Sequence, residues 1–193
     1  MPSHAEAIEN AALLMRSFAG RTGLTSDRPK QRYLWTDAFA VRNFLGLARL
    51  TGERSYADLA LRLVDQVHHV LGRYRADDTR TGWISGLGER EGEFHPTRGG
   101  LRIGKTLPER RPEEPLDQRP EWDRDGQYFH YLTKWMHALG GLLADAHRVA
   151  QLMALGMLDD GMLLVAGSRA SAGAHSVGAS RHQRSDAGDQ SGP

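Results

Sequence analysis

The stretch of residues 36–71, TDAFAVRNFLGLARLTGERSYADLALRLVDQVHHVL, decides the fold, because two amphipathic segments in it are separated by a short polar link. Apolar residues recur three or four positions apart in both segments, which indicates two helices. They are Ala40, Val41, Phe44, Leu45, Leu47 and Ala48 in the first, and Leu59, Leu63, Val67 and Val70 in the second. A link as short as residues 51–55 favours antiparallel packing, so we predict a helix hairpin.

Both helices of this hairpin have polar residues suited to capping their starts. Thr36 or Asp37 can cap the first helix, because the side-chain oxygens of Thr and Asp accept hydrogen bonds from free backbone N–H groups. Ser55 and Asp58 offer an N-terminal box for the second helix. We therefore expect the first helix to begin near Thr36 and the second near Ser55.

Helical pattern also flanks the hairpin on both sides. Ser3 and Glu6 have the spacing of a capping box, which predicts a helix that ends at Gly20. We expect another helix to begin at Asp125, and apolar helical pattern continues over residues 142–165. The predicted fold class is therefore all-α, built from antiparallel helix hairpins.

Residues 74–124 have no helical periodicity, and five of them are proline. We predict a long irregular loop, with a short strand pair formed by residues 82–87 and 99–103. Aromatic residues argue that this loop is ordered, since disordered linkers contain few of them. The residues concerned are Trp83, Phe94 and Trp122.

The C-terminal part differs in composition from the rest of the chain. All 14 aromatic residues lie at or before Trp135, and the last 58 residues contain none. From Gly167 onward, 16 of 27 residues are Gly, Ala or Ser, which predicts disorder. The predicted organisation is a domain over residues 1–140, a further helical segment over residues 141–166, and a disordered tail over residues 167–193.

Two hypotheses explain this change of composition. In the first, the authentic sequence ends near Leu139 or Gly140, and the remainder is out of frame or replaced. In the second, an ordinary helix pair is followed by a tail. Composition alone does not choose between them. An intact reading frame across this junction in the source gene, with no longer alternative frame, would contradict the first hypothesis.

The overall composition excludes several classes of function. The 25 Lys and Arg residues nearly balance 24 Asp and Glu, so no field of one sign favours binding to nucleic acid or anionic lipid. The absence of cysteine excludes disulfides, thiolate metal sites and a cysteine nucleophile. The chain has neither a basic N-terminal segment nor an apolar run of about 18 residues, so we expect no signal peptide, no membrane span and a cytoplasmic location.

Residues 99–106, GGLRIGKT, match the pattern of a phosphate-binding loop. Such a loop needs a buried strand before it and a helix after it. Here polar residues precede it and four prolines follow, so we interpret it as a glycine turn that carries exposed basic residues.

The acidic residues around Gly126 superficially resemble the start of an EF-hand calcium loop. An EF-hand is excluded, because Leu132 stands at the position where the calcium loop requires Glu. We predict neither a metal site nor a cofactor.

Two short segments combine acidic and aromatic residues: residues 33–37, YLWTD, and residues 122–131, WDRDGQYFHY. Aromatic rings stack on the apolar face of a sugar, while carboxylates, amides and imidazoles bind its hydroxyls. Both segments lie at predicted helix starts, which can face one pocket in a hairpin array. The predicted binding residues for a small-molecule or oligosaccharide ligand are Trp35, Trp122, Tyr128, His130, Tyr131, Gln127 and Arg98.

Carboxylates in such a pocket suggest glycoside hydrolysis, in which one acid protonates the leaving oxygen and another acts as base or nucleophile. The candidate catalytic residues are Asp123, Asp37 and Asp125. A competing interpretation makes Asp37 and Asp125 helix caps and the aromatic residues core. Asp123 is not needed as a cap and is therefore the strongest of the three candidates.

Residues 35–39, WTDAF, and the link at residues 50–56, LTGERSY, resemble the hairpin unit of the six-hairpin glycosidase-like (α/α) toroid superfamily. Residues 121–135 resemble a pocket-lining helix start of the same group, which includes glycoside hydrolases, unsaturated uronyl hydrolases and sugar 2-epimerases. The resemblance covers residues 5–139, too few for a complete ring. It implies a partial toroid and a carbohydrate-active protein, glycoside hydrolase-like or sugar epimerase-like, or an inactive fragment of one.

The sequence therefore leaves two classes of function open. A carbohydrate-active protein requires the acidic and aromatic candidates to converge on one cavity. A non-catalytic helical interaction module requires the same side chains to be scattered, or buried as caps and core. The side chains that distinguish the two classes are those of Trp35, Asp37, Asp123, Tyr128 and His130.

Overall fold

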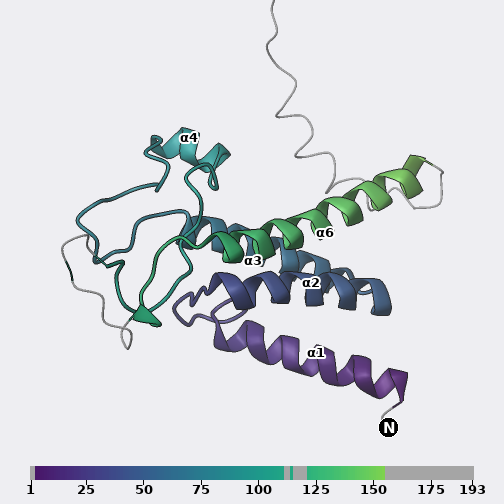
Figure 1. Cartoon of the computed structure of the whole chain (residues 1–193). Helices are drawn as coiled ribbons and strands as arrows, with labels where there is room; N and C mark the ends of the chain where they lie inside the picture. Colours follow the sequence, from purple (N-terminus) through teal and green to yellow (C-terminus); the bar gives the residue numbers. More distant parts are fainter. Residues whose placement is uncertain (1–2, 111–113, 115–120, 155–193) are drawn as a thin grey trace, which may run out of the picture. The chain divides into compact units, whose positions relative to one another are not determined.

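The computed structural model describes residues 3–110, 114 and 121–154 (Figure 1). The helices among these residues are α1 (His4–Arg21), α2 (Leu34–Thr51), α3 (Arg54–Leu71), α4 (Glu89–Phe94) and α6 (Phe129–Ala154). The same residues contain no strand, only isolated bridges that join Arg73 to Trp83 and Leu107 to Arg124. The predicted all-α class is therefore confirmed for the described part of the chain. The described residues up to His147 belong to one compact unit.

The predicted capping box at the start of α1 is confirmed. The Ser3 hydroxyl accepts a hydrogen bond from the Glu6 N–H at 3.2 Å, and the Glu6 carboxylate accepts one from the Ser3 N–H at 2.6 Å. The helix ends at Arg21 with Thr22 as its C-cap, so the prediction that Gly20 ends it is wrong by one residue.

Helix α2 begins earlier than its polar residues suggest. Its N-cap is Tyr33, which makes no side-chain capping bond, and its first residue is Leu34. The predicted caps Thr36 and Asp37 both lie inside the helix, so that prediction is wrong. Asp37 instead accepts a hydrogen bond from the backbone N–H of Tyr33 at 2.9 Å.

Helix α3 is joined to α2 by only two residues, Gly52 and Glu53, and the two helices pack against each other. Gly52 ends α2 in the left-handed conformation, with φ of 74°, which a residue with a side chain rarely adopts. Glu53 is the N-cap of α3 and makes no side-chain capping bond, so the predicted box of Ser55 and Asp58 is wrong. The chain thus turns between these helices within two residues.

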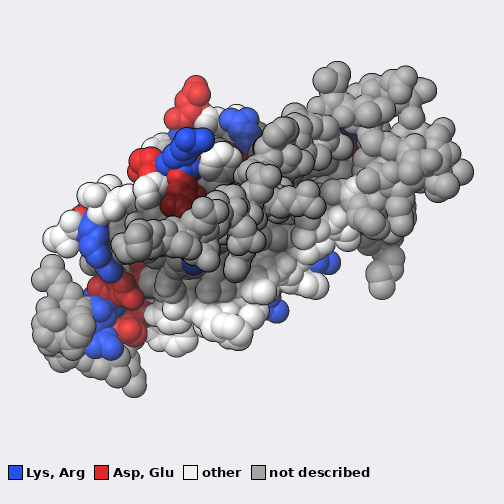
Figure 2. Space-filling view, turned by 90° about the horizontal axis from the view of Figure 1, so that it is seen from above, with Lys and Arg blue, Asp and Glu red and all other residues white. Residues whose placement is uncertain are grey.

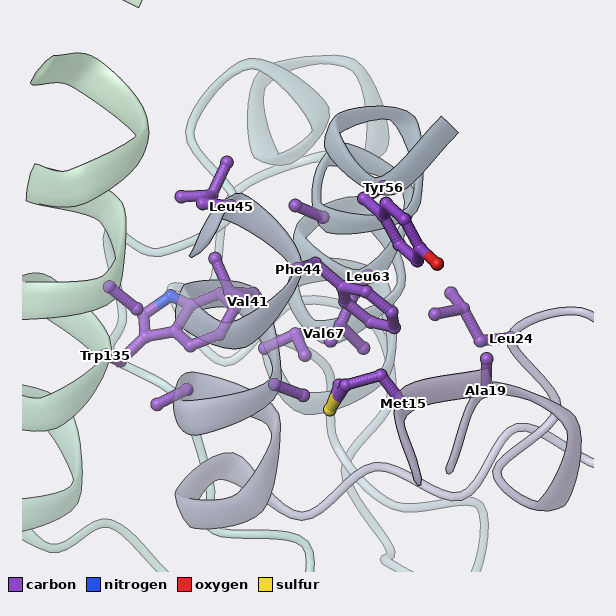
Figure 3. Close-up of a cluster of buried hydrophobic side chains, with 14 of the residues drawn as sticks. Met15, Ala19, Leu24, Val41, Phe44, Leu45, Tyr56, Leu63, Val67 and Trp135 are labelled. Carbon is purple, nitrogen blue, oxygen red and sulfur yellow. The ribbon is translucent and has the colours of Figure 1, made fainter. Parts of the chain in front are cut away.

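The core is formed by side chains of α1, α2, α3 and α6 (Figure 3). Phe44 of α2 and Leu63 of α3 are fully buried, and Met15 of α1 packs beside them. Trp135 of α6 is also buried, and its indole N–H donates a hydrogen bond to His68 of α3 at 3.3 Å. Helix α6 is therefore part of the same core as the α2–α3 pair.

Helix α6 begins at Phe129, so the prediction of a start at Asp125 is wrong. The helix continues through Leu139 and Gly140, the residues where the sequence suggested a junction.

No helix in the described residues is long and apolar enough to cross a lipid bilayer. The prediction of a disordered tail over residues 167–193, and part of the predicted segment over residues 141–166, fall outside the described residues.

The irregular region contains a short helix, α4, in place of the predicted strand pair. Residues 82–87 and 99–103 form no strands, so that prediction is wrong. Helix α4 is attached to α3 by His69, whose imidazole Nε2 lies 2.9 Å from the Glu93 carboxylate. Its sequence, EREGEF, has a single large apolar residue, which explains why periodicity did not indicate a helix.

We expect Phe44→Ala to lower the free energy of unfolding by about 3–5 kcal/mol, because Phe44 is completely buried and truncation leaves a cavity. Urea denaturation followed by circular dichroism measures the change. The control is Leu14→Ala, since Leu14 is mostly exposed on α1 and its truncation should cost less than about 0.5 kcal/mol. Equal losses in the two variants would contradict the assigned core.

Candidate functional site

A cleft of about 540 Å³ lies beside the start of α6, and we call it the aromatic cleft. Three of its residues, Tyr128, His130 and Tyr131, come from the start of α6 or the residue before it. The others come from the irregular region. The full lining is Ile103, Lys105, Glu121, Trp122, Arg124, Tyr128, His130 and Tyr131.

The starts of α2 and α6 meet through aromatic side chains at this cleft. The hydroxyls of Tyr33 and Tyr131 lie 2.7 Å apart. The Trp35 ring centroid is 5.3 Å from that of Tyr131 and 6.3 Å from that of His130, both in edge-on geometry. The two aromatic segments found in the sequence therefore lie next to each other, although 85 positions separate residues 37 and 122 in the chain.

The Tyr131 hydroxyl remains protonated at neutral pH. Burial, together with its hydrogen bond to Tyr33, raises the pKa of Tyr131 to about 12. A protonated phenol can donate a hydrogen bond or accept one, but it cannot act as a base. Tyr131 is thus suited to binding a hydroxyl group and not to removing its proton.

Charged side chains also line the cleft. Lys105 Nζ lies 5.3 Å from the centre of the Tyr33 ring and 4.0 Å from an Asp123 carboxylate oxygen. Arg124 pairs with Glu114 at 2.8 Å and with Glu121 at 3.7 Å. The cleft therefore contains both hydrogen-bond donors and acceptors, with no large excess of either charge.

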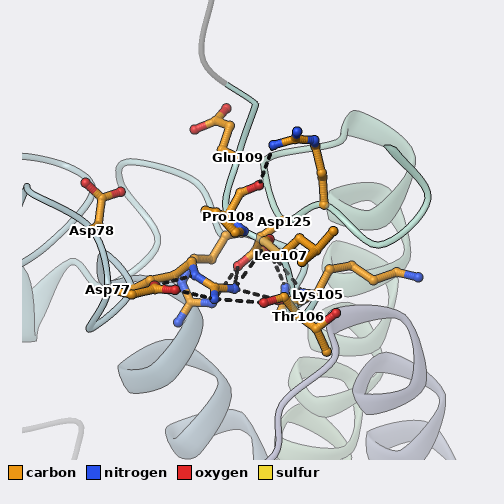
Figure 4. Close-up of polar contacts among 12 residues, drawn as sticks. Asp77, Asp78, Lys105, Thr106, Leu107, Pro108, Glu109 and Asp125 are labelled. Carbon is orange, nitrogen blue, oxygen red and sulfur yellow. Dashed lines mark hydrogen bonds and ion pairs between the residues drawn. The ribbon is translucent and has the colours of Figure 1, made fainter. Parts of the chain in front are cut away.

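The Asp125 carboxylate is held by more partners than any other predicted site residue (Figure 4). One of its oxygens accepts a hydrogen bond from Arg102 at 2.7 Å, and Arg75 lies 3.6 Å away. The other accepts bonds from the backbone N–H groups of Gly104 at 2.7 Å and Gly126 at 3.0 Å. Asp125 is buried and fully engaged, which favours a structural role.

In a phosphate-binding loop, the backbone N–H groups of residues 99–106 would bind a phosphate. Here two of them bind the Asp125 carboxylate. The N–H groups of Gly104 and Lys105 both point at Asp125. Residues 105–110, all described, contain no helix. The interpretation as a glycine turn therefore agrees with the structure, although Arg102 is paired with Asp125 and is not an exposed basic residue.

Backbone hydrogen bonds connect this turn to both helix starts. The Leu34 N–H at the start of α2 donates to the Ile103 carbonyl at 3.0 Å. The Ile103 N–H donates in turn to the Gly126 carbonyl at 2.8 Å, three residues before α6. Gly104 has φ of +84°, and a Cβ there would collide with the Arg32 carbonyl oxygen. The turn is thus packed directly between the two segments that carry the aromatic residues.

Asp37 lies inside the protein and does not line the aromatic cleft. Its carboxylate is 3.7 Å from Arg32, which is equally buried. Burial raises the pKa of Asp37 to about 7, although Arg32 and the Tyr33 N–H both act to lower it. Among the described residues, the Nε and Nη1 atoms of Arg32 have no hydrogen-bond partner, so the charges of this pair are weakly compensated.

Asp123 is the one predicted catalytic carboxylate that is open to solvent, with 65% of its side chain exposed. Trp122 beside it is 81% exposed and lines the cleft. Gln127 is directed elsewhere, because its amide donates to the Gly99 carbonyl at 2.7 Å. Arg98 pairs with Glu91 of α4 at 3.8 Å and does not line the cleft.

The structure thus brings together Trp122, Tyr128, His130 and Tyr131, with Trp35 in contact behind them. Three charged lining residues were not among the predicted site residues: Lys105, Glu121 and Arg124. Glu121 and Arg124 lie within residues 121–135, which resemble a pocket-lining helix start, but they were not chosen as site residues. Lys105 reaches the cleft through the contact between the turn at residues 99–106 and the segment before α6. The charge of the three residues alone is equally typical of a solvated loop.

Other features of the described residues give no further indication of chemistry. No group of three or more His, Asp or Glu side chains in this part of the chain is arranged to hold a metal ion. Basic and acidic side chains are interspersed over the loops in Figure 2, in agreement with the near-neutral charge. Comparisons of the chain with protein-family models, curated proteins and solved structures found no match.

We expect Asp125→Asn to lower the free energy of unfolding by about 3 kcal/mol or more, because it leaves the Arg102 guanidinium without its charge partner. The matched control is Asp123→Asn, two residues earlier, where exposure should limit the loss to about 0.5 kcal/mol. Guanidinium denaturation of both variants measures the difference. A loss in Asp125→Asn no larger than in the control would refute the structural role.

Asp37 should make stability depend on pH. Its pKa rises from 3.8 in its ordinary state to about 7 on folding, so the folded protein retains a proton that the unfolded chain releases. This contribution is complete below about pH 4 and is lost as the pH rises through about 7. Relative to Asp37→Asn, the wild type should lose up to about 4 kcal/mol across that interval.

Urea unfolding of both proteins at a series of pH values measures this difference. The Asp37→Asn variant serves as the reference, because the amide has nearly the shape of the acid and does not titrate. A difference that stays constant, or that grows in favour of the wild type as the pH rises, would contradict the raised pKa.

Proposed function

We propose that this protein binds a carbohydrate in the aromatic cleft. The observation that carries the proposal is the large exposed ring of Trp122 at a cleft that Tyr128, His130 and Tyr131 also line. An indole left so open to water is a suitable platform for the apolar face of a sugar ring. A ring in this position would cover the indole and the adjacent aromatic side chains together.

The polar groups of the cleft fit the hydroxyls of such a ligand. Lys105 and Arg124 supply donors, Glu121 supplies an acceptor, and the Tyr131 hydroxyl can do either. Sugars need donors and acceptors in similar number, because each hydroxyl both gives and receives hydrogen bonds. The mixed charge of the wall therefore supports a sugar better than a purely apolar or purely anionic ligand.

A catalytic role depends on which carboxylates can reach this ligand. Asp37 and Asp125, two of the three predicted catalysts, are buried against arginines. Glu121 lines the cleft, and the exposed Asp123 does not line it but lies 4.0 Å from the lining residue Lys105. We therefore propose that glycoside hydrolysis or sugar epimerisation would proceed through these two carboxylates.

The fold is compatible with the resemblance to the (α/α) toroid superfamily. Helices α2 and α3 are joined by two residues, and α6 packs on the same core. We propose that these helices are part of such a toroid. A fold of this kind supports many activities, so the function rests on the cleft itself.

A non-catalytic helical interaction module is the second candidate function. The observation that favours it is the complete engagement of Asp125 together with the burial of Asp37, as expected if both acids serve only the fold. In that case the cleft would have no measurable affinity for sugars.

A screen of mono- and oligosaccharides by isothermal titration calorimetry tests the proposal. We expect Trp122→Ala to weaken the binding of a sugar found in the screen by about tenfold or more, because stacking on one aromatic ring contributes more than about 1 kcal/mol. The control is Phe94→Ala, since Phe94 is also a largely exposed aromatic residue but does not line the cleft.

Two outcomes of this screen would overturn the proposal. The first is that no sugar binds the wild type at millimolar concentration. The second is that Phe94→Ala weakens binding as much as Trp122→Ala does. Thin-layer analysis of the bound sugars, repeated with Asp123→Asn and Glu121→Gln, separates simple binding from hydrolysis or epimerisation.

A further inference from the structure

Helix α6 has an exposed apolar stripe on its flank, next to the side that packs in the core. Trp135 and Ala138 are buried in the core. Phe129, Met136 and Leu143 are 80%, 66% and 70% exposed, respectively, and lie seven residues apart. Residues with this spacing share one side of a helix, so the three form a continuous exposed stripe along α6.

The stripe is part of a longer pattern that we call the α6 seam. Its six residues alternate in steps of three and four, the spacing of a coiled-coil heptad, and none is charged. Leu132 and Leu139 are half-buried at the edge of the core, and Ala146 is exposed. The seam consists of Phe129, Leu132, Met136, Leu139, Leu143 and Ala146.

We propose that the α6 seam packs against the α6 seam of a second copy of this chain, with the two helices antiparallel. Antiparallel helices pair the first residue of one heptad with the fourth residue of another. This register places Phe129 against Ala146 of the second copy, Leu132 against its Leu143 and Met136 against its Leu139. A twofold axis relates the two copies in every one of these pairs, and it sets the largest seam residue, Phe129, against the smallest, Ala146.

Two further features favour this arrangement. Thr133 and Gly140 lie beside the seam and are exposed, and a Cβ built on Gly140 would meet nothing within 4 Å. Small uncharged residues at this position leave room for a second helix to approach closely. An antiparallel pair also sets opposite helix dipoles side by side and keeps the two aromatic clefts, which lie at the starts of α6, apart.

Sedimentation equilibrium of the full chain tests the proposal. We expect a dimer in the wild type and a dimer dissociation constant at least about tenfold higher in Met136→Glu, because a central charge would be buried in the pair. The matched control is Leu14→Glu on α1, where the side chain is 68% exposed and lies outside the seam. This variant should dimerise like the wild type.

The absence of cysteine makes the orientation testable by single substitutions. In the antiparallel register the two copies of residue 136 lie about 4.5 Å apart along the helix axis, whereas the two copies of residue 129 lie about 25 Å apart. We therefore expect Met136→Cys, and not Phe129→Cys, to form a disulfide-linked dimer on oxidation.

Each contrary result would overturn the proposal. Disulfide formation in Phe129→Cys would indicate parallel helices. Dimers that Leu14→Glu weakens and Met136→Glu does not would place the interface elsewhere. A monomeric wild type refutes pairing outright, and if Met136→Glu then also lowers the thermal stability of that monomer, another part of the same chain covers the seam.

Discussion

The buried carboxylate of Asp125 is the constraint on which the region around the cleft depends. A charge removed from water is tolerated only when its partners compensate for the lost hydration. Arg102 and the N–H groups of Gly104 and Gly126 provide this compensation at 2.7–3.0 Å. Because Arg102 and Gly104 belong to the glycine turn, and Arg75 at 3.6 Å to the chain after α3, this one carboxylate ties both segments to the chain before α6 and so helps to position Lys105 at the cleft.

Asp37, the second buried aspartate, has fewer hydrogen bonds and ion pairs to replace its lost hydration. Asp37 has one arginine at 3.7 Å and one backbone N–H at 2.9 Å, and its pKa rises to about 7. A carboxyl group with such a pKa is often a sign of a catalytic acid. Here the group lies outside the aromatic cleft, and the simpler explanation is a structural pair between the loop before α2 and the helix itself. Burial alone thus produces the electrostatic signature of an active site.

Periodicity predicted the helical segments of residues 36–71 because it reports which side of a helix faces the core, and Phe44 and Leu63 do face it. The sequence did not locate the starts of α2 and α3. Their N-cap residues, Tyr33 and Glu53, make no side-chain capping hydrogen bond, so no capping pattern marks either start. Aromatic and acidic composition predicted four residues of the cleft. The sequence left open whether Lys105 binds a ligand or is solvated. Its position at the cleft follows from contacts between segments about 20 residues apart, which local patterns do not encode.

The backbone bonds from Leu34 to Ile103 and from Ile103 to Gly126 have an evolutionary consequence. These bonds join backbone N–H and C=O groups, and every amino acid other than proline has both groups. The side chains that line the aromatic cleft can therefore change without breaking these bonds, whereas Gly104 and Asp125 cannot be replaced without strain or the loss of an ion pair. Inserting or deleting a single residue between these anchor points would instead shift one helix start relative to the other. The length of the segments between the anchor points is accordingly more tightly constrained than the type of the residues that line the cleft.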